Sequence, residues 1–208
     1  MLPSLAPEDT NVNLYGIALF FHIIGLIALF SGLVILQRGG VRLRTAATWE
    51  EARVWLQLLR PVGGMFLAGS IFLLATGLYM ARIGWTFRAP WVVVAEVFVV
   101  TFALVGAVVG RGLARMGRAA REHAGEISSD DQHLLRAPAV WASIFAMNGG
   151  AMGMVWLMTT KPDWAISIAV PAILMLAGAV VGMSVSKSRR EPESTWQPMA
   201  GVRERHAS

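Results

Sequence analysis

Hydrophobic residues in this chain are gathered into five long runs, which polar segments separate. Each run has 20 to 23 residues, and a helix needs about 20 residues to cross a bilayer core of about 30 Å. The pattern therefore predicts an all-α fold, a polytopic helical membrane bundle with five transmembrane helices. The runs cover residues 14–36, 62–81, 91–110, 137–158 and 165–185.

Lysine and arginine are distributed unevenly between the segments that flank these runs. Residues 37–61, 111–136 and 187–208 fall on one side of a five-span protein and hold 15 of the 18 cations. Positive charge is enriched on the cytoplasmic side of membrane proteins. We therefore expect a multi-pass protein of a prokaryotic-type inner cell membrane, with the N-terminus outside and the C-terminus cytoplasmic. The chain then consists of a five-span domain, residues 1–186, and a polar cytoplasmic tail, residues 187–208.

The segment before the second run predicts a short amphipathic helix. Thr48 followed by Glu51 has the pattern of a capping box, and apolar residues then recur on one face of "WEEARVWLQLLR". Such a helix either lies on the cytoplasmic membrane surface or extends the second span. Both arrangements remain open at this point.

Short repeats relate the first two runs to the next two. "LLRP" precedes the second run and "LLRAP" the fourth, and a methionine near the end of each of these runs is followed by a cation and a tryptophan. The matches predict two duplicated hairpins plus a fifth helix. "GAVVG" occurs at residues 106–110 and 178–182. Both copies predict close helix packing, because small residues let backbones approach each other.

His22 and Glu96 are the only acidic or basic side chains within the runs. Counted from Tyr15 and Trp91, they lie at similar depths, about 10 and about 8 Å from the outer ends of their helices. Each shares a helix face with small residues, so we expect both to point into the bundle and to face each other, directly or through one water. The small residues are Ala18, Gly25 and Gly32 on the first run and Ala103, Ala107 and Gly110 on the third.

This polar pair has two interpretations. Ionisable residues inside a membrane are commonly functional, which predicts a ligand-binding or proton-linked site that is reached from outside. Alternatively, His22 and Glu96 hold helices together by hydrogen bonds. The candidate polar neighbours are Thr76, Tyr79 and Asn148.

Methionines are frequent in the fourth run, at positions 147, 152, 154 and 158. With His22 they suggest a soft copper site for Cu(I), with His22 and Met152 as candidate ligands, or a haem b with Met and His as axial ligands. Methionine also fills gaps in ordinary cores, so we assign no cofactor. The chain has no cysteine, which excludes disulfides and thiolate metal sites.

The chain lacks the sequence motifs of several classes of enzyme and of nucleic-acid-binding proteins. It has no serine–histidine–acid set, no phosphate-binding loop and no HExxH sequence, so we expect a protein that is not an enzyme. The sequence pI of about 10.7 does not indicate a nucleic-acid partner, because the arginines flank the spans and no RNA- or DNA-binding motif accompanies them. The expected partners are the lipid bilayer and, through the small-residue helix faces, a second copy or another membrane subunit.

Three segments carry a resemblance to a known family: "FFHIIGLIALFSG", "LLATGLYM" and "VWLMTTKP". They resemble the integral membrane proteins catalogued as domain of unknown function 2269, over roughly spans one to four. This resemblance implies a small helical bundle without an established activity. The histidine and glycine of the first span are also similar to those of copper-resistance D-type membrane proteins.

Three functions follow as hypotheses. The first is a non-enzymatic membrane protein with a polar intramembrane site at His22 and Glu96, which handles a small solute or a metal such as copper. The second is a haem-binding electron-transfer subunit. The third is an accessory or assembly subunit of a membrane complex.

Overall fold

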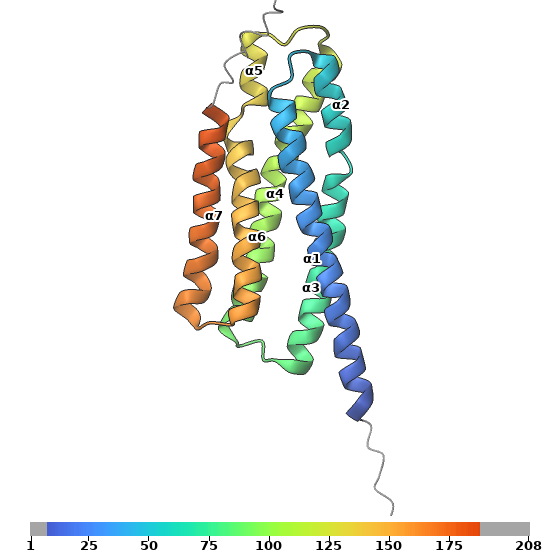
Figure 1. Cartoon of the computed structure of the whole chain (residues 1–208), viewed down its shortest axis with the longest axis vertical. Helices are drawn as coiled ribbons and strands as arrows, with labels where there is room; N and C mark the ends of the chain where they lie inside the picture. The colour runs from blue at the N-terminus through green and yellow to red at the C-terminus, as the bar shows by residue number, and fades with distance from the viewer. Residues whose placement is uncertain (1–7, 188–208) are drawn as a thin grey trace, which may run out of the picture.

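A computed structural model describes the backbone of residues 8–187 and the side chains of residues 14–187. Over that range the chain forms an all-α bundle without a β-strand, which confirms the predicted fold class (Figure 1). The predicted tail, apart from Lys187, lies outside the described residues. The helices are α1 (Glu8–Arg44), α2 (Trp49–Leu59), α3 (Val62–Gly84), α4 (Pro90–Glu122), α5 (Ser129–Leu135), α6 (Pro138–Thr160) and α7 (Trp164–Lys187).

The described residues contain five helical segments that are long and apolar enough to cross a membrane, which confirms the predicted count. Each segment includes one of the five hydrophobic runs. The helices also extend beyond the runs. For example, α4 continues to Glu122, because the residues after its apolar part are mainly alanine and arginine, which favour helix. The segments are Leu14–Arg44, Trp49–Gly84, Pro90–Glu122, Ser129–Thr160 and Trp164–Lys187.

The cations lie mostly at one end of the bundle, which we call the basic end. Here α1, α4 and α7 finish and α3 and α6 begin (Figure 1). The cations of the described residues at this end are Arg38, Arg42, Arg44, Arg53, Arg60, Arg111, Arg115, Arg118, Arg121, Arg136 and Lys187. We call the opposite end, which carries Trp85, Trp91 and Trp164, the tryptophan end; its described cations are Arg82, Arg88 and Lys161.

The short helix α2 forms as its capping signal predicts. The hydroxyl oxygen of Thr48 accepts a hydrogen bond from the backbone N–H of Glu51 at 3.3 Å, and the Glu51 carboxylate accepts one from Ala47 at 3.1 Å. Arg60 and Pro61 both keep right-handed helical backbone angles. As a result α2 leads directly into α3 (Figure 1). Of the two arrangements that the sequence left open, α2 is the extension of the second span.

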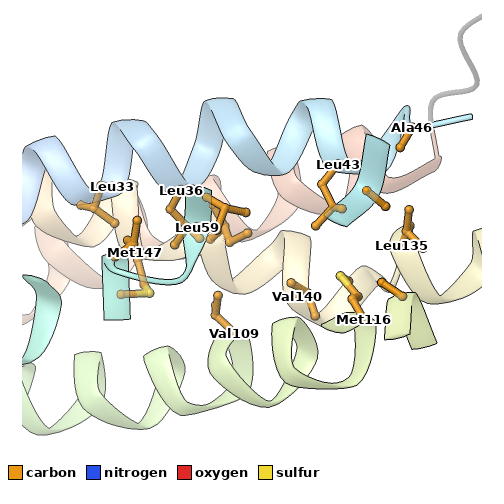
Figure 2. Packing of buried hydrophobic residues seen from close by; sticks show 14 of the residues in the cluster. Leu33, Leu36, Leu43, Ala46, Leu59, Val109, Met116, Leu135, Val140 and Met147 are labelled. Atoms are coloured by element: carbon orange, nitrogen blue, oxygen red, sulfur yellow. The ribbon is translucent and has the colours of Figure 1, made fainter. Parts of the chain in front are cut away.

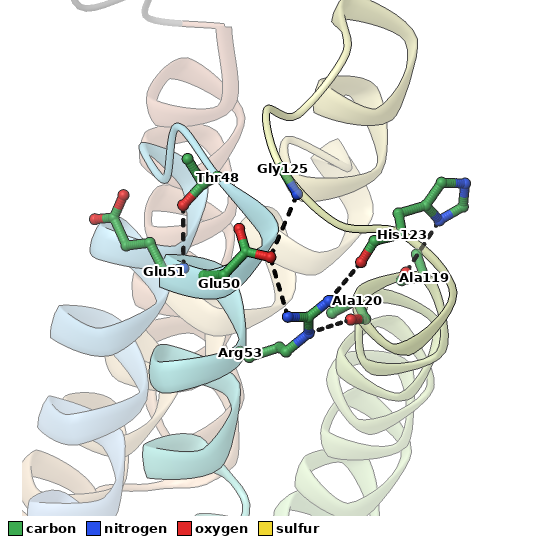
Figure 3. A network of polar contacts seen from close by, with 8 residues as sticks. All are labelled: Thr48, Glu50, Glu51, Arg53, Ala119, Ala120, His123 and Gly125. Atoms are coloured by element: carbon green, nitrogen blue, oxygen red, sulfur yellow. Dashed lines mark hydrogen bonds and ion pairs between the residues drawn. The ribbon is translucent and has the colours of Figure 1, made fainter.

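A polar clamp fastens α2 to the C-terminal end of α4. The guanidinium of Arg53 donates hydrogen bonds to the carbonyls of Ala120 and His123, both at 2.5 Å, and to Glu50 at 3.2 Å (Figure 3). Glu50 in turn accepts a hydrogen bond from the backbone N–H of Gly125 at 3.3 Å. The clamp satisfies two of the carbonyls that a helix end leaves without a partner inside the helix.

The hydrophobic core fills the half of the bundle next to the basic end. Leucines of α1 and α2 point toward α4 and α6 and fill the space between these helices (Figure 2). Fully buried side chains of this kind each contribute roughly 1.5–3 kcal/mol in water, but in lipid the contribution comes mainly from close packing. The core residues labelled in the figure are Leu33, Leu36, Leu43, Ala46, Leu59, Val109, Met116, Leu135, Val140 and Met147.

The second copy of the GAVVG motif lies in the most extensive helix contact of the bundle, between α6 and α7. A Cβ atom added at Gly178 would overlap the carbonyl of Phe145, and one added at Gly182 would overlap the carbonyl of Trp141. The packing role predicted for residues 178–182 is confirmed. Because α7 packs along α6, the fifth span belongs to the bundle of this chain.

The small-residue stripe predicted on α1 is confirmed, since Ala18, Gly25 and Gly32 are all buried. The stripe predicted on α4 is wrong. Ala103, Ala107 and Gly110 are exposed there, and a Cβ added at Gly110 would meet nothing within 4 Å. The face that α4 buries carries larger side chains, which fill more of the space between helices: Val92, Phe102, Val109 and Met116. The bundle contains the hairpins α1–α3 and α4–α6, and their duplication stays a prediction.

Candidate functional site

A cavity of about 440 Å³ lies in the half of the bundle next to the tryptophan end. It forms because α1 packs along α3 and α4 packs along α6, whereas α3 and α4 contact each other only sparsely. Most of its lining consists of leucine, valine, methionine and aromatic side chains. The polar side chains that line it are Tyr15, His22, Ser70, Glu96, Thr159 and Lys161.

His22 lies half-buried on α1 and lines this cavity. Its Nδ1 atom is 3.0 Å from the hydroxyl oxygen of Thr76 on α3. The Thr76 hydroxyl donates its single hydrogen to the carbonyl of Phe72 at 2.6 Å, so it accepts from His22. The hydrogen of a neutral imidazole is then on Nδ1, and Nε2 is a hydrogen-bond acceptor.

Glu96 lines the same cavity from α4, half-buried on the opposite wall. Among the described residues it forms no hydrogen bond or ion pair, and in particular none with His22. The direct pairing of His22 with Glu96 that the sequence predicted is therefore wrong. The partner of His22 is Thr76, because α3 packs against α1 while α4 lies across the cavity. The shared cavity leaves a bridge through water as a prediction.

Four predicted site residues do not line the cavity, and one of them, Thr76, still contacts His22. Tyr79 is exposed on α3, and Asn148 donates a hydrogen bond to the carbonyl of Ile144 in its own helix at 2.9 Å. Met152, the predicted metal ligand, is 58% exposed on the outside of α6. Helix geometry explains these misses, since each residue advances about 100° around the axis and only one face of each helix meets the cavity.

Two other methionines of the fourth run, which the sequence named but did not choose as ligands, line the cavity instead of Met152. Met154 and Met158 are four residues apart and belong to the inward face of α6. They could contribute soft sulfur ligands beside His22. The described residues contain no group of three or more His, Cys, Asp or Glu side chains that could hold a metal ion.

A cation and two tryptophans lie together where the cavity meets the tryptophan end. The ammonium of Lys161 is 3.9 Å from the ring centroid of Trp85 and 5.7 Å from that of Trp91. The two indole rings meet edge to face, with centroids 5.3 Å apart. All three side chains line the cavity. The sequence marks them as membrane-interface residues, but their meeting depends on how α6 packs beside the α3–α4 connection.

No protein-family model, curated protein or solved structure matches this chain. The resemblance to domain of unknown function 2269 and to copper-resistance D-type proteins therefore stays a prediction.

Proposed function

We propose that this protein is a non-enzymatic membrane protein that binds a small, mostly apolar molecule in the cavity between its two hairpins. The observation that supports this most strongly is that His22 and Glu96, from different helices, line one cavity of about 440 Å³. Small-molecule sites are typically concave and apolar, with a few polar groups that orient the ligand. The cavity has this composition.

The polar groups indicate the kind of ligand. Nδ1 of a neutral His22 donates to Thr76, so its Nε2 is an acceptor. An ionised Glu96 also only accepts hydrogen bonds. A ligand with a hydroxyl, amine or amide N–H group would supply the donor that both acceptors need. We therefore propose a ligand with an apolar body and one such donor group.

We also propose that the cavity lies in the outer half of a prokaryotic-type inner membrane. Eleven of the 14 Lys and Arg residues in the described range are at the basic end, and positive charge favours the cytoplasmic side. The tryptophan end then faces outward. In this orientation ligand reaches His22 and Glu96 past Lys161 and its two tryptophans.

Photolabelling tests this proposal. The probe is octanol with a diazirine on its chain, added to the detergent-purified full chain. We expect crosslinks on cavity-lining segments of α1, α3, α4 and α6. Ala95→Phe, which fills the cavity from α4, should remove most of this labelling. The matched control is Val97→Phe, on the same helix at a residue that is 62% exposed. Equal labelling of both variants would contradict the proposal.

A second candidate is a Cu(I) site, favoured because Met154 and Met158 line the cavity that contains His22. Thioether and imidazole are suitable ligands for Cu(I). We expect the double change Met154→Leu and Met158→Leu to weaken Cu(I) binding at least about tenfold, while Met152→Leu leaves it unchanged. Equal Cu(I) binding by the unchanged protein, the double variant and Met152→Leu would exclude this candidate. A visible absorption spectrum of the same protein tests the haem hypothesis, because bound haem absorbs strongly there.

A further inference from the structure

A second cavity, of about 510 Å³, lies at the basic end and is separate from the intramembrane cavity. It is formed by α5, the start of α6 and the end of α7. Unlike the first cavity, it is lined almost entirely by polar side chains. Its lining residues are Ser129, Gln132, His133, Arg136, Pro138, Ser186 and Lys187.

The charge of this lining favours an anion. Arg136 and Lys187 are cationic, and no carboxylate of the described residues lines the cavity. Of the two acidic residues of α5, neither of which lines the cavity, Asp130 is exposed and Asp131 accepts a hydrogen bond from the Ser128 hydroxyl at 2.9 Å. A further cation adjoins the wall, because Arg44 donates a hydrogen bond to the carbonyl of Val185.

Arg136 provides an independent observation. Its Nε atom is buried and has no hydrogen-bond partner among the described residues. A buried donor of a charged group is costly to leave unsatisfied. Arginine forms its strongest hydrogen bonds with oxyanions such as phosphate, which accept from two N–H groups at once. Because the Nε atom is closed to solvent, a phosphate in the cavity would bind the terminal N–H groups of the same guanidinium, which form no hydrogen bond among the described residues.

The depth of the cavity indicates where such a phosphate comes from. Pro138 is the first residue of α6 and Lys187 is the last of α7, and both helices are long and apolar enough to cross a membrane. The cavity is thus level with the place where two spans leave the apolar core, which is where lipid phosphates lie. Basic pockets between helix ends on the cytoplasmic side are suited to anionic lipid headgroups.

We propose that this cavity binds the headgroup phosphate of an anionic phospholipid, with Arg136 and Lys187 as its principal contacts. The cavity is larger than a phosphate group alone requires, which leaves room for the rest of a headgroup. The proposal does not depend on the ligand of the intramembrane cavity, because the two cavities share no lining residue.

The test uses the full chain in an uncharged detergent and three probes: dioctanoyl-phosphatidylglycerol, dioctanoyl-phosphatidylcholine and inorganic phosphate. Binding is followed by native mass spectrometry and by the thermal unfolding midpoint. We expect phosphatidylglycerol to bind and raise the midpoint, and the other two probes to do so at least about tenfold more weakly. Equal binding of phosphatidylcholine would overturn the requirement for an anionic headgroup. Equal binding of inorganic phosphate would overturn the assignment to lipid.

Variants separate this cavity from general attraction by the basic end. Arg136→Gln and Lys187→Gln should each weaken phosphatidylglycerol binding about fivefold, the effect typical of one cation near an anionic surface. The matched controls Arg115→Gln and Arg118→Gln remove exposed cations of α4 at the same end that do not line the cavity. They should change binding less than twofold. Equal losses in both pairs would overturn the site. If Arg136→Gln does not fold, the binding measured for Lys187→Gln tests the site alone. Lys187 is exposed at a helix end, so its substitution should leave the fold intact.

Discussion

His22 donates a hydrogen bond to Thr76 across the α1–α3 contact, with 3.0 Å between Nδ1 and the hydroxyl oxygen. This bond orients the imidazole at the wall of the cavity. Thr76→Val removes the acceptor and keeps the shape of the side chain, so the His22 N–H loses its partner. We expect the free energy of unfolding to fall by about 0.5–2 kcal/mol. Chemical unfolding in mixed micelles measures this, and Thr76→Ser should restore most of the loss.

A matched control separates the bond from a general effect of threonine. Thr101 on α4 donates only to the carbonyl of Val97 in its own helix, at 3.0 Å, so Thr101→Val should cost less than Thr76→Val. In a double-mutant cycle, His22→Leu and Thr76→Val should couple by at least about 0.5 kcal/mol. Glu96→Leu and Thr76→Val should be additive. Additive losses for the first pair would show that the hydrogen bond does not contribute.

The two GAVVG motifs should respond in opposite ways to the same substitution. Gly178→Ala places a Cβ against the carbonyl of Phe145, so α6 and α7 must separate. We expect a loss of about 1–3 kcal/mol in the free energy of unfolding, as for other overpacked contacts. Gly110→Ala adds a methyl group where nothing lies within 4 Å, so stability should be unchanged or slightly higher. Equal losses in the two variants would contradict the assigned packing faces.

Acid should loosen the clamp between α2 and α4. Hydrogen bonding by the backbone N–H of Glu50 itself, then by that of Gly125, together with the charge of Arg53, holds the pKa of the Glu50 carboxyl below its ordinary value. A lowered pKa means that Glu50 stabilises the folded state above the ordinary value of about 4.3, and that this contribution is lost as the pH falls through the folded pKa.

Hydrogen exchange of the Gly125 amide measures this effect. Its protection should fall as the pH is lowered below about 4, after correction for the intrinsic exchange rate. Glu50→Gln should make the protection independent of pH over this range. The control Glu122→Gln changes a nearby exposed carboxylate that makes no hydrogen bond or ion pair within the described residues. In this variant the protection of the Gly125 amide should still fall at low pH. A fall of the same size in Glu50→Gln would assign the effect to another group.

Membrane orientation is tested by reporter fusions. Because the cations gather at the basic end, a reporter that works only in the cytoplasm should be active when it is fused after Ser208. A reporter that works only outside the cytoplasm should be inactive there. A tag before Met1 should be accessible from outside intact cells. The proposed direction of access to the cavity depends on this result. A C-terminus outside the cell would reverse it.

Local signals in the sequence predicted the elements of the fold correctly. The five spans follow from hydrophobic length alone, and the Thr48 cap follows from side chains within four residues of one another. These features need no knowledge of which helices are neighbours. The same reasoning gave His22 and Glu96 similar depths, because depth along a helix depends only on residue count, and both line one cavity.

The partners across helices could not be predicted in the same way. Equal depth of His22 and Glu96 does not reveal that α3 packs beside α1, which makes Thr76 the partner. Likewise, small residues indicate that two helices can approach but not that they do. They predict the buried face of α1 correctly, whereas α4 buries Phe102 and exposes Ala103. Lys161 meets Trp85 only in the folded bundle.

Cysteine protection tests most directly whether the cavity lined by His22 and Glu96 admits a small molecule from the tryptophan end. The chain has no cysteine, so Ala95→Cys in the cavity wall and Val97→Cys on the exposed face each carry a single thiol. We predict that a small water-soluble methanethiosulfonate reagent modifies Ala95→Cys faster than Val97→Cys, and that octanol slows only the former. Equal rates for the two variants, or equal protection by octanol, would contradict the account.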